Sequence, residues 1–578
     1  ARYGILVVVG LTALAGWGVA YLLSSRHNLP LSHRTPRPGM LVFGLTALIL
    51  LESWSAPLIG PEFPAGEQIA PVYHWLRQAT PPETVVLELP YQGASEFIYE
   101  YYSSYHWRHL ANGGTGFTPP IYKELRQWFN AFPDSRSVDV IRQLGIDLVI
   151  LHSDSYTPDE WQRVLAALPL YLPAIERIDQ IGRAVVLHMA PPTCRPEPGL
   201  VQVDLAPTGL DGLSNAVEVT YHNHGPAAFV ADVQQTGALT FNNGTGKNFT
   251  EPLVTPAGET QSVIIPLQHQ ISTDLSQARL PGLDRTIPAG QEPPSGESSI
   301  PAQVTDELQW QPLGLQFAEG PRLAAFSLSP SAPTACDRLA VALDWTDGQP
   351  GDTALLQLLD PFGQVVAESA VHPWLDQVEA RLDIRTLPLP GSLPAGRYGL
   401  RISVRHADGS ERWPITEEGV TIPPDQIPPL PVTIHPAPRP VTGDEFALTS
   451  PPLFDGIITL TGRKLAQDRV SVGGWLRFSL TWQIDRSLDE PLTVFTQLIG
   501  PDGQVWGQQD NRPGGGWYDV SLWPPGQPVV DDYAFQIQPD APPGTYRLIA
   551  GLYRSDTLAR LTTQTGADFV EIGSVVVE

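Results

Sequence analysis

Residues 498–505 read LIGPDGQV, and residues 358–365 read LLDPFGQV. Each stretch has an apolar end, a Pro-x-Gly turn and a return to Val, which predicts two strands joined by a tight hairpin. Trp345 lies 18 residues before the first turn glycine, and Trp482 lies 21 residues before the second. The turns are followed by PAGRY at 394–398 and PPGTY at 542–546. This shared order predicts a repeat of two immunoglobulin-like β-sandwiches with the Trp and Tyr in their cores.

Shorter strands and turns continue upstream of this repeat. Residues 215–222 alternate, with Val217, Val219 and Tyr221 on one face, as in a half-buried strand. We therefore expect about three β-sandwiches, at 198–270, 316–421 and 446–578. The segment 271–315 has Pro, Gly, Ser, Gln and Glu without period, and 422–445 is rich in Pro, so both are predicted to be linkers.

Residues 61–190 have a different character and predict an α/β domain. Apolar runs alternate with helix signals, which favours a sheet covered by helices. The predicted strands are 84–89, 147–151 and 184–188. The predicted helices are 95–106, 119–129, one capped by Ser137 that ends at Leu144, and one after Thr157 that ends near Leu168.

The first 60 residues predict two transmembrane helices joined by a basic loop. The stretches 3–23 and 40–59 are apolar and near the roughly 20 residues that a spanning helix needs. Arg26, Arg34 and Arg37 lie between them, so the loop is expected inside and the rest of the chain outside. The predicted location is the plasma membrane, multi-pass, with the bulk of the chain extracytoplasmic.

Two alternatives apply to these apolar stretches. A cleaved signal peptide explains one stretch but not two, and the first lacks a basic start and a small-residue cleavage site. Buried core helices remain open, although an uncharged run of this length is unusual in a soluble core. Because the chain begins directly at an apolar stretch, we also expect further membrane helices upstream.

Composition excludes some functions. The net charge of −26 argues against nucleic acid, which requires clustered Lys and Arg. Apolar residues make up 42% of the 578 residues, enough for packed cores. We find no phosphate-binding loop, hydrolase or metal motif, so no catalytic residue, metal or cofactor is predicted. Asp510, Asp531 and Asp532 are a weaker Ca²⁺ alternative at the end of a sandwich.

The two cysteines lie in segments assigned to different domains. Cys194 follows the α/β domain and Cys336 lies in a β-sandwich. A disulfide would have to join domains, so two unpaired thiols are the favoured interpretation, and pairing stays open.

The densest group of polar and aromatic residues lies in the α/β domain. Glu88 ends a predicted strand, where open α/β sheets place ligand sites, and a Tyr-rich helix and a Gly-rich loop follow. Backbone N–H groups of such a loop can approach an anion, and aromatic faces can stack on sugars. The candidate ligand-binding residues are Glu88, Tyr91, Glu96, Tyr102, His106, Asn112, Gly113 and Gly116. The alternative is that these aromatics pack the domain onto the outer membrane surface.

Part of the chain resembles a known group of membrane proteins. The matching residues are PVYHWL at 71–76, VLELP at 86–90, YYS at 101–103, His106, NG at 112–113, GF at 116–117 and PP at 119–120. They resemble the outer domain of multi-pass GT-C glycosyltransferases, the mannosyltransferase-like enzymes that use polyprenyl-phosphate sugars. The tail is similar to C-terminal β-domains of such proteins in Chloroflexi-like bacteria, through DGI at 455–457, Trp482, GQV at 503–505, WPPG at 523–526 and PGTY at 543–546.

This resemblance implies a function without catalysis in this chain. In that family the catalytic acid lies in the first outer loop of a many-helix bundle, which this chain lacks. The expected function is the extracytoplasmic C-terminal part of a glycosyltransferase-like protein that binds an acceptor or a lipid-linked sugar. The alternatives are a membrane-anchored surface protein whose sandwiches bind glycan or partner proteins, and a hydrolase within 60–190 that uses Glu88.

Overall fold

The chain divides into two compact units in the computed structural model, residues 1–69 and residues 70–578. The structure describes residues 12, 16–18, 20–21, 43–44, 46–48 and 64–578, with gaps at 93, 115–119, 211–212, 232–236, 243–245, 250–252, 268–274, 282, 284–285, 289–307, 319, 347–351, 370–371, 374–381, 407, 409, 417–418, 424–425, 438–447 and 449.

The described residues before Pro64 are helical and exposed. They include the large apolar side chains of Trp17, Tyr21, Phe43 and Leu48. Within the described residues, no helix is long and apolar enough to cross a membrane. Most of the two predicted spans, at 3–23 and 40–59, lies outside the described residues.

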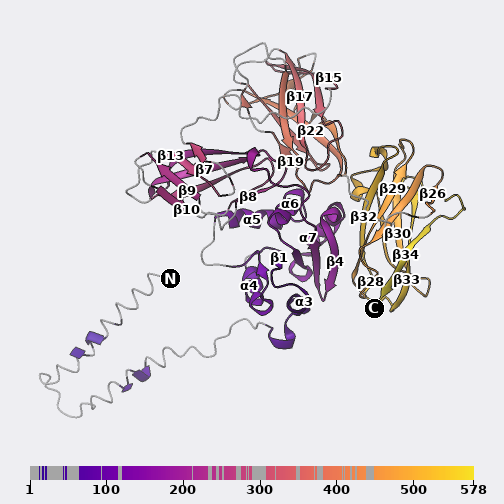
Figure 1. Ribbon diagram of the computed structural model, residues 1–578, viewed down its shortest axis with the longest axis horizontal. Coiled ribbons are helices and arrows are strands. Elements are labelled where there is room, and N and C mark those ends of the chain that lie inside the picture. Colours follow the sequence, from indigo (N-terminus) through magenta and orange to yellow (C-terminus); the bar gives the residue numbers. More distant parts are fainter. Residues whose placement is uncertain are drawn as a thin grey trace. The chain divides into compact units, whose positions relative to one another are not determined.

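The first sheet of the second unit is mixed, with the strand order β2-β1-β3-β5-β4. Its strands β1 and β4 are labelled in Figure 1. β1 runs parallel to β2 and β3, whereas β5 is antiparallel to β3 and β4. The strands are β1 Val85–Leu89, β2 His109–Leu110, β3 Leu148–His152, β4 Ile175–Ile181 and β5 Ala184–Met189. The three predicted strands are confirmed, since continuous apolar runs suit strands that are buried on both faces.

Five named helices accompany this sheet in the described residues. They are α3 Pro71–Ala79, α4 Ala94–His106, α5 Pro120–Asn130, α6 Ser135–Gln143 and α7 Pro158–Tyr171. Thr157 caps α7 as predicted, because its hydroxyl accepts from the Glu160 N–H and the Glu160 carboxylate accepts in return. The predicted cap at Ser137 is wrong. Asp134 caps α6, and its carboxylate accepts from the Ser137 N–H at 2.7 Å, so Ser137 lies inside the helix.

Side-chain alternation along β1 assigns the helices to two faces of the sheet. Leu87 and Leu89 belong to a core with Phe129 of α5, Val140 of α6 and Leu168 of α7. Glu88 points to the opposite face, where the Tyr73 hydroxyl of α3 donates to it. The sheet is therefore covered by α5, α6 and α7 on one side and by α3 and α4 on the other.

A β-sandwich follows the α/β part, as predicted. Its strands are β6 Val201–Leu210, β7 Leu213–Asn223, β8 Phe229–Ala231, β9 Gly237–Phe241, β10 Gly246–Phe249, β11 Leu253–Thr255, β12 Thr260–Pro266, β13 Leu275–Arg279 and β14 Thr286–Pro288. One core contains Val217 of β7, Leu239 of β9 and Ala278 of β13, which belong to two different sheets. The predicted linker at 271–315 is wrong where β13 and β14 pair, because β13 completes the sheet beside β9.

Two further sandwiches complete the chain, each with two sheets around its own core. The first has β15 Gln311–Phe317, β16 Arg322–Ser329, β17 Arg338–Thr346, β18 Thr353–Leu359, β19 Val365–Glu368, β20 His372–Pro373, β21 Leu382–Pro388, β22 Gly396–Arg405, β23 Glu411–Arg412, β24 Pro414–Ile415 and β25 Leu430–Ile434. The second has β26 Leu453–Phe454, β27 Ile458–Leu465, β28 Arg469–Val470, β29 Trp475–Ile484, β30 Leu492–Ile499, β31 Val505–Asn511, β32 Pro528–Gln536, β33 Gly544–Arg554 and β34 Val570–Val577.

The predicted repeat is confirmed by matching contacts. Trp345 and Trp482 are both buried, on β17 and β29. The Tyr398 hydroxyl donates to the Pro394 carbonyl at 2.7 Å, and the Tyr546 hydroxyl donates to the Pro542 carbonyl at 2.6 Å.

The hairpin turns match too. Gly363 and Gly503 adopt φ values of 82° and 79°, which glycine tolerates without a Cβ clash. The predicted linker at 422–445 is wrong where β25 pairs with β22 inside it.

Candidate functional site

Glu88 lies at the centre of the buried polar cluster between the sheet and α3. Its side chain is fully buried, and its Oε2 accepts from the Tyr73 hydroxyl at 2.8 Å and lies 2.8 Å from the His152 Nε2. The other oxygen, Oε1, is buried and has no hydrogen-bond partner among the described residues. Burial, and then the Glu88 carboxylate, raise the pKa of the Tyr73 phenol well above its usual range, so Tyr73 stays a donor.

His106 closes the other side of this cluster. It ends α4, is 1% exposed, and its ring is parallel to the Tyr73 ring at 6.0 Å between centroids. Its Nδ1 accepts from the Arg108 N–H at 3.0 Å, which assigns the proton of the neutral ring to Nε2. Burial lowers the pKa of His106, although the Glu88 charge opposes this. In the described part of the chain Nε2 has no partner, so the cluster holds an unused donor and an unused acceptor.

Asn112 and Asn130 fix the backbone near β1 rather than bind a ligand. The Asn112 amide accepts from the Glu88 N–H at 3.0 Å and donates to the Glu88 carbonyl at 2.7 Å. Asn130 bonds the N–H and carbonyl of Tyr91 in the same way, at 3.0 Å each. Each side-chain amide therefore makes the two backbone hydrogen bonds that a neighbouring strand would otherwise make at that residue.

Tyr91 and Glu96 form a separate group with α5. Glu96 is buried and makes an ion pair with Arg126, whose guanidinium lies 5.3 Å from the centre of the Tyr91 ring. Burial raises the pKa of Tyr91 well above its usual range. This ion pair joins α5 to α4 and leaves Tyr91 and Glu96 buried, whereas the Arg126 side chain stays partly exposed.

The remaining predicted residues lie close to α4. Tyr102 is 6% exposed and stacks on Tyr73 at 4.6 Å. The Gly113 N–H donates to the Tyr122 hydroxyl at 2.6 Å, so this amide is used within the domain. Gly116 lies outside the described residues. The structure thus gathers Glu88, Tyr102 and His106 around Tyr73, with Asn112 bonded to the Glu88 backbone, and it buries the candidate rings of Tyr91 and Tyr102.

Tyr73 and His152 also belong to the cluster, although neither was predicted from the sequence. His152 lies at the end of β3, beside β1, and the same strand-end rule that indicated Glu88 would have indicated it. Tyr73 lies on α3, a helix that the sequence analysis did not predict and that covers the cluster.

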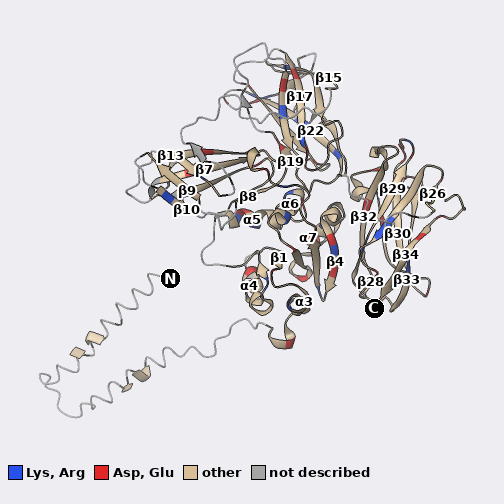
Figure 2. Ribbon diagram, viewed as in Figure 1, with Lys and Arg blue, Asp and Glu red and all other residues tan. Residues whose placement is uncertain are grey.

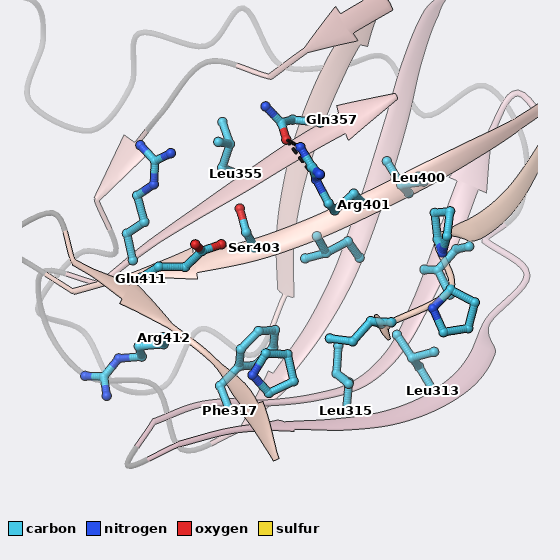
Figure 3. Close-up of a pocket in the computed structure, with 17 residues that line it drawn as sticks. Leu313, Leu315, Phe317, Leu355, Gln357, Leu400, Arg401, Ser403, Glu411 and Arg412 are labelled. Atoms are coloured by element: carbon cyan, nitrogen blue, oxygen red, sulfur yellow. Dashed lines mark hydrogen bonds between the residues drawn. The ribbon is translucent and has the colours of Figure 1, made fainter. Parts of the chain in front are cut away.

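A pocket of about 440 Å³ lies in the sandwich of β15–β25 (Figure 3). Strand β22 pairs with β25 at Gly396–Leu400 and with β23 at Val404–Arg405. Between them, Arg401 to Ser403 have no strand neighbour on that edge within the described residues, and these residues line the pocket. The volume is in the range of small-molecule sites.

The pocket is amphipathic. Leu313, Leu315 and Phe317 of β15 form an apolar wall, and the polar residues Gln357, Arg401, Ser403 and Glu411 lie across from it (Figure 3). Arg405 also lines the pocket. The Arg401 Nε donates to the Gln357 Oε1 at 3.0 Å, so a neutral amide orients this guanidinium without cancelling its charge.

The charge of this pocket differs from the charge of the whole chain. The charge of Arg412 is cancelled by the buried carboxylate of Asp352, 2.9 Å from its Nε. Arg401 and Arg405 then outweigh Glu411. The pocket is locally positive in an acidic chain whose charged residues are otherwise scattered (Figure 2).

The Ca²⁺ alternative is wrong. Asp531 accepts from the Gly514 N–H at 3.0 Å and Asp532 from the Ser479 hydroxyl at 2.6 Å. As neighbours on β32 they point to opposite faces of the sheet and cannot share an ion. The described residues contain no cluster of three or more His, Cys, Asp or Glu that could hold a metal.

The favoured interpretation of two free thiols is also wrong, because Cys194 and Cys336 form a disulfide with their Cα atoms 5.6 Å apart. The Gln143 side chain of α6 donates to the Cys194 carbonyl at 2.9 Å, and the Thr193 hydroxyl donates to the Gly391 carbonyl at 3.0 Å. These contacts hold the segment after β5 against both the α/β part and the sandwich of β15–β25, so the two thiols meet.

Comparisons with known proteins add little. No protein-family model matches the chain, and no curated protein matches it. Among solved structures, the chain is similar to the native conformation of Escherichia coli alpha-2-macroglobulin and to a mutant of Salmonella alpha-2-macroglobulin. Both are 11% identical with a TM-score of 0.14, and the matches cover 68% of this chain but only 20% and 21% of those chains. So low a TM-score supports no argument about architecture or function.

Proposed function

We propose that the chain is the extracytoplasmic, non-catalytic part of a membrane-anchored protein of the cell envelope. The observation that carries this proposal is the Cys194–Cys336 disulfide. Disulfides persist in oxidising compartments outside the cytoplasm and are rare within it. The positive-inside arrangement of Arg26, Arg34 and Arg37 independently favours the same side for the residues that follow.

The N-terminal residues support anchoring in a bilayer. Trp17, Tyr21, Phe43 and Leu48 are helical, and each is at least 66% exposed. Large apolar side chains on a helix are stable when something covers them, and the apolar stretches 3–23 and 40–59 have the length that lipid requires. The resemblance to GT-C proteins extends the proposal to a glycosyltransferase-like assembly.

The proposed role within that assembly is binding of a lipid-linked sugar or acceptor, and the pocket of Figure 3 is the site that supports it. Its apolar wall suits an aliphatic chain, and Arg401 and Arg405 suit a phosphate. A polyprenyl phosphate combines both features. The buried Glu88 cluster is a poorer candidate, because its rings and carboxylate are covered by α3 and α4.

Thiol accessibility tests the location. Full-length chain is isolated from membranes without reductant and treated with a maleimide polymer that slows migration for each free thiol. We expect no shift before reduction and a shift for two thiols after it. Two reactive thiols before reduction would contradict the disulfide and remove the main support for an extracytoplasmic location.

Ligand binding tests the role. Farnesyl phosphate and farnesol are titrated against the full chain in nanodiscs, and we expect the phosphate to bind at least ten times more tightly. R401Q and R405Q should weaken phosphate binding. R397Q is the matched control, since Arg397 is exposed on the same strand but does not line the pocket. Equal affinity for both probes, or an equal loss in the control, refutes the proposed site.

A further inference from the structure

Helix α4 exposes an unusual run of large apolar side chains. Phe97 is 60% exposed, Ile98 37% and Tyr101 48%, and Trp107, directly after the helix, is 76% exposed. We call these four residues the α4 patch. Glu100 and Ser104 are the other exposed positions of this helix in the described residues. The solvent face of a helix is normally polar, so this surface requires a cover.

The backbone conformation fixes the position of Trp107. Its φ of 56° lies in the left-handed region, which a bulky residue rarely adopts. The Trp107 N–H donates to the Ser103 carbonyl at 2.8 Å, and the next residue, Arg108, donates to the Thr80 hydroxyl at 2.9 Å and the His106 carbonyl at 2.9 Å. These bonds fix the turn, so an indole that is mostly exposed is nevertheless held in place.

Phe97 is also supported from one side. A Cβ on Gly114 would lie 2.5 Å from the Phe97 ring, so the glycine backbone passes directly against this ring. The Gly-rich segment that was expected to approach an anion therefore lets the chain pack beside the patch. The patch is a rigid surface with a supported Phe, and a flexible loop would not present its rings in this way.

We infer that the α4 patch lies in the interfacial layer of a lipid bilayer, an inference that rests on the proposed membrane anchorage. The second apolar stretch ends near residue 59 and α3 begins at Pro71, so the eleven residues between them reach at most about 40 Å. Tyr73 of α3 stacks on Tyr102 of α4 at 4.6 Å, so the chain enters the domain on the same layer as the patch.

The composition of the patch fits lipid headgroups. Trp and Tyr are enriched at membrane interfaces, where an apolar ring and a polar edge are both satisfied. Phe97 and Ile98 would supply the deeper apolar contact. Because the segment between the second apolar stretch and α3 is short, the α4 patch stays within reach of the bilayer surface.

Spin labelling in nanodiscs tests this inference on the full chain. A nitroxide is attached at S104C, which lies between Tyr101 and Trp107 and leaves the patch intact. The control label, at Q162C, is on the exposed side of α7, across the sheet from α4. A third label at L50C lies in the second apolar stretch. Collision rates with oxygen, which enters lipid, and with a nickel chelate, which does not, are measured for each.

We expect the label at 104 to collide with oxygen at least threefold more than with the chelate, and the label at 162 to show the reverse. Replacing Phe97, Tyr101 and Trp107 with Gln should shift the label at 104 to the behaviour of the control. If the label at residue 50 is immersed in lipid and the label at residue 104 is not, the inference that the α4 patch contacts lipid is overturned, while the membrane anchorage stands. A protein partner would then be the remaining cover for the patch. If neither is immersed, both fail.

Discussion

Replacing Asp139 with asparagine is expected to stabilise the α/β part near neutral pH. Asp139 lies on α6, is 3% exposed, and its Oδ2 accepts from the Ala228 N–H of the next sandwich at 2.9 Å. Burial raises the pKa of this carboxyl to about 6, although the Ala228 hydrogen bond and the Arg142 charge both oppose the rise. Ionising the Asp139 carboxyl therefore costs more free energy in the folded protein than in the unfolded chain.

The magnitude follows from proton linkage. A rise of the carboxyl pKa from its ordinary value of 3.8 to about 6 corresponds to about 3 kcal/mol. Because the folded pKa is the higher one, the folded state binds more protons between pH 4 and 6. Its stability therefore falls as pH rises through this window. Asparagine keeps an acceptor for Ala228 and removes the buried charge, so D139N should gain most of this energy at pH 7.5 and little at pH 3.5.

Hydrogen exchange provides the assay, because a chain of several domains does not unfold in one step. Exchange of amides in α6 and at Ala228 is measured at both pH values for the native chain, D139N and the exposed control D159N. We expect slower exchange in D139N at pH 7.5 and no change in the control. Faster exchange in D139N at pH 7.5 would refute the reasoning, since it would mean that the attraction to Arg142 outweighs the cost of burial.

Three further predictions concern the contacts that hold the domains. Y398F and Y546F should each destabilise their own sandwich by about 1 kcal/mol, measured as faster amide exchange in β22 and in β33, because each loses one hydrogen bond; a loss in only one would contradict the equivalence of the repeats. N112A should cost about 2 kcal/mol by removing both bonds to the Glu88 backbone, measured as faster exchange in β1, and unchanged exchange would show that the amide is dispensable. C194S with C336S should cost up to about 5 kcal/mol for a bridge across 142 residues, measured as faster amide exchange in α6 and β17, and unchanged exchange would argue against the bridge.

The sandwich repeat could be predicted because its signals are local. Asp360 and Asp502 accept from the N–H groups of Gln364 and Gln504 within their own turns, and Gly363 or Gly503 supplies the positive φ. Short-range turn chemistry of this kind is visible in six or seven residues of sequence. Strands β1, β3 and β5 were equally accessible, since each is a mainly apolar run, whereas β2 and the more polar β4 were not predicted.

Long-range partners could not be predicted in the same way. The Cys194–Cys336 bridge depends on Gln143 and Thr193 holding a loop against two domains, which no spacing reveals. The pocket on β22 depends on β25, a strand inside a Pro-rich segment that resembles a linker. Pro is compatible with an edge strand, so composition alone misleads there.

The two faces of α4 carry different groups of residues, and each face fits a different one of the two predicted roles. Tyr99, Tyr102 and His106 recur at helical spacing on the buried face, over Glu88, whereas Phe97, Ile98 and Tyr101 lie on the exposed face. From the sequence, a ligand site and a membrane-facing surface were alternatives for the same residues. Since α3 covers the inner face, the inner residues can serve a buried cluster and the outer residues an interface. A substitution on one face should then leave the other intact, which makes the two roles separable by experiment.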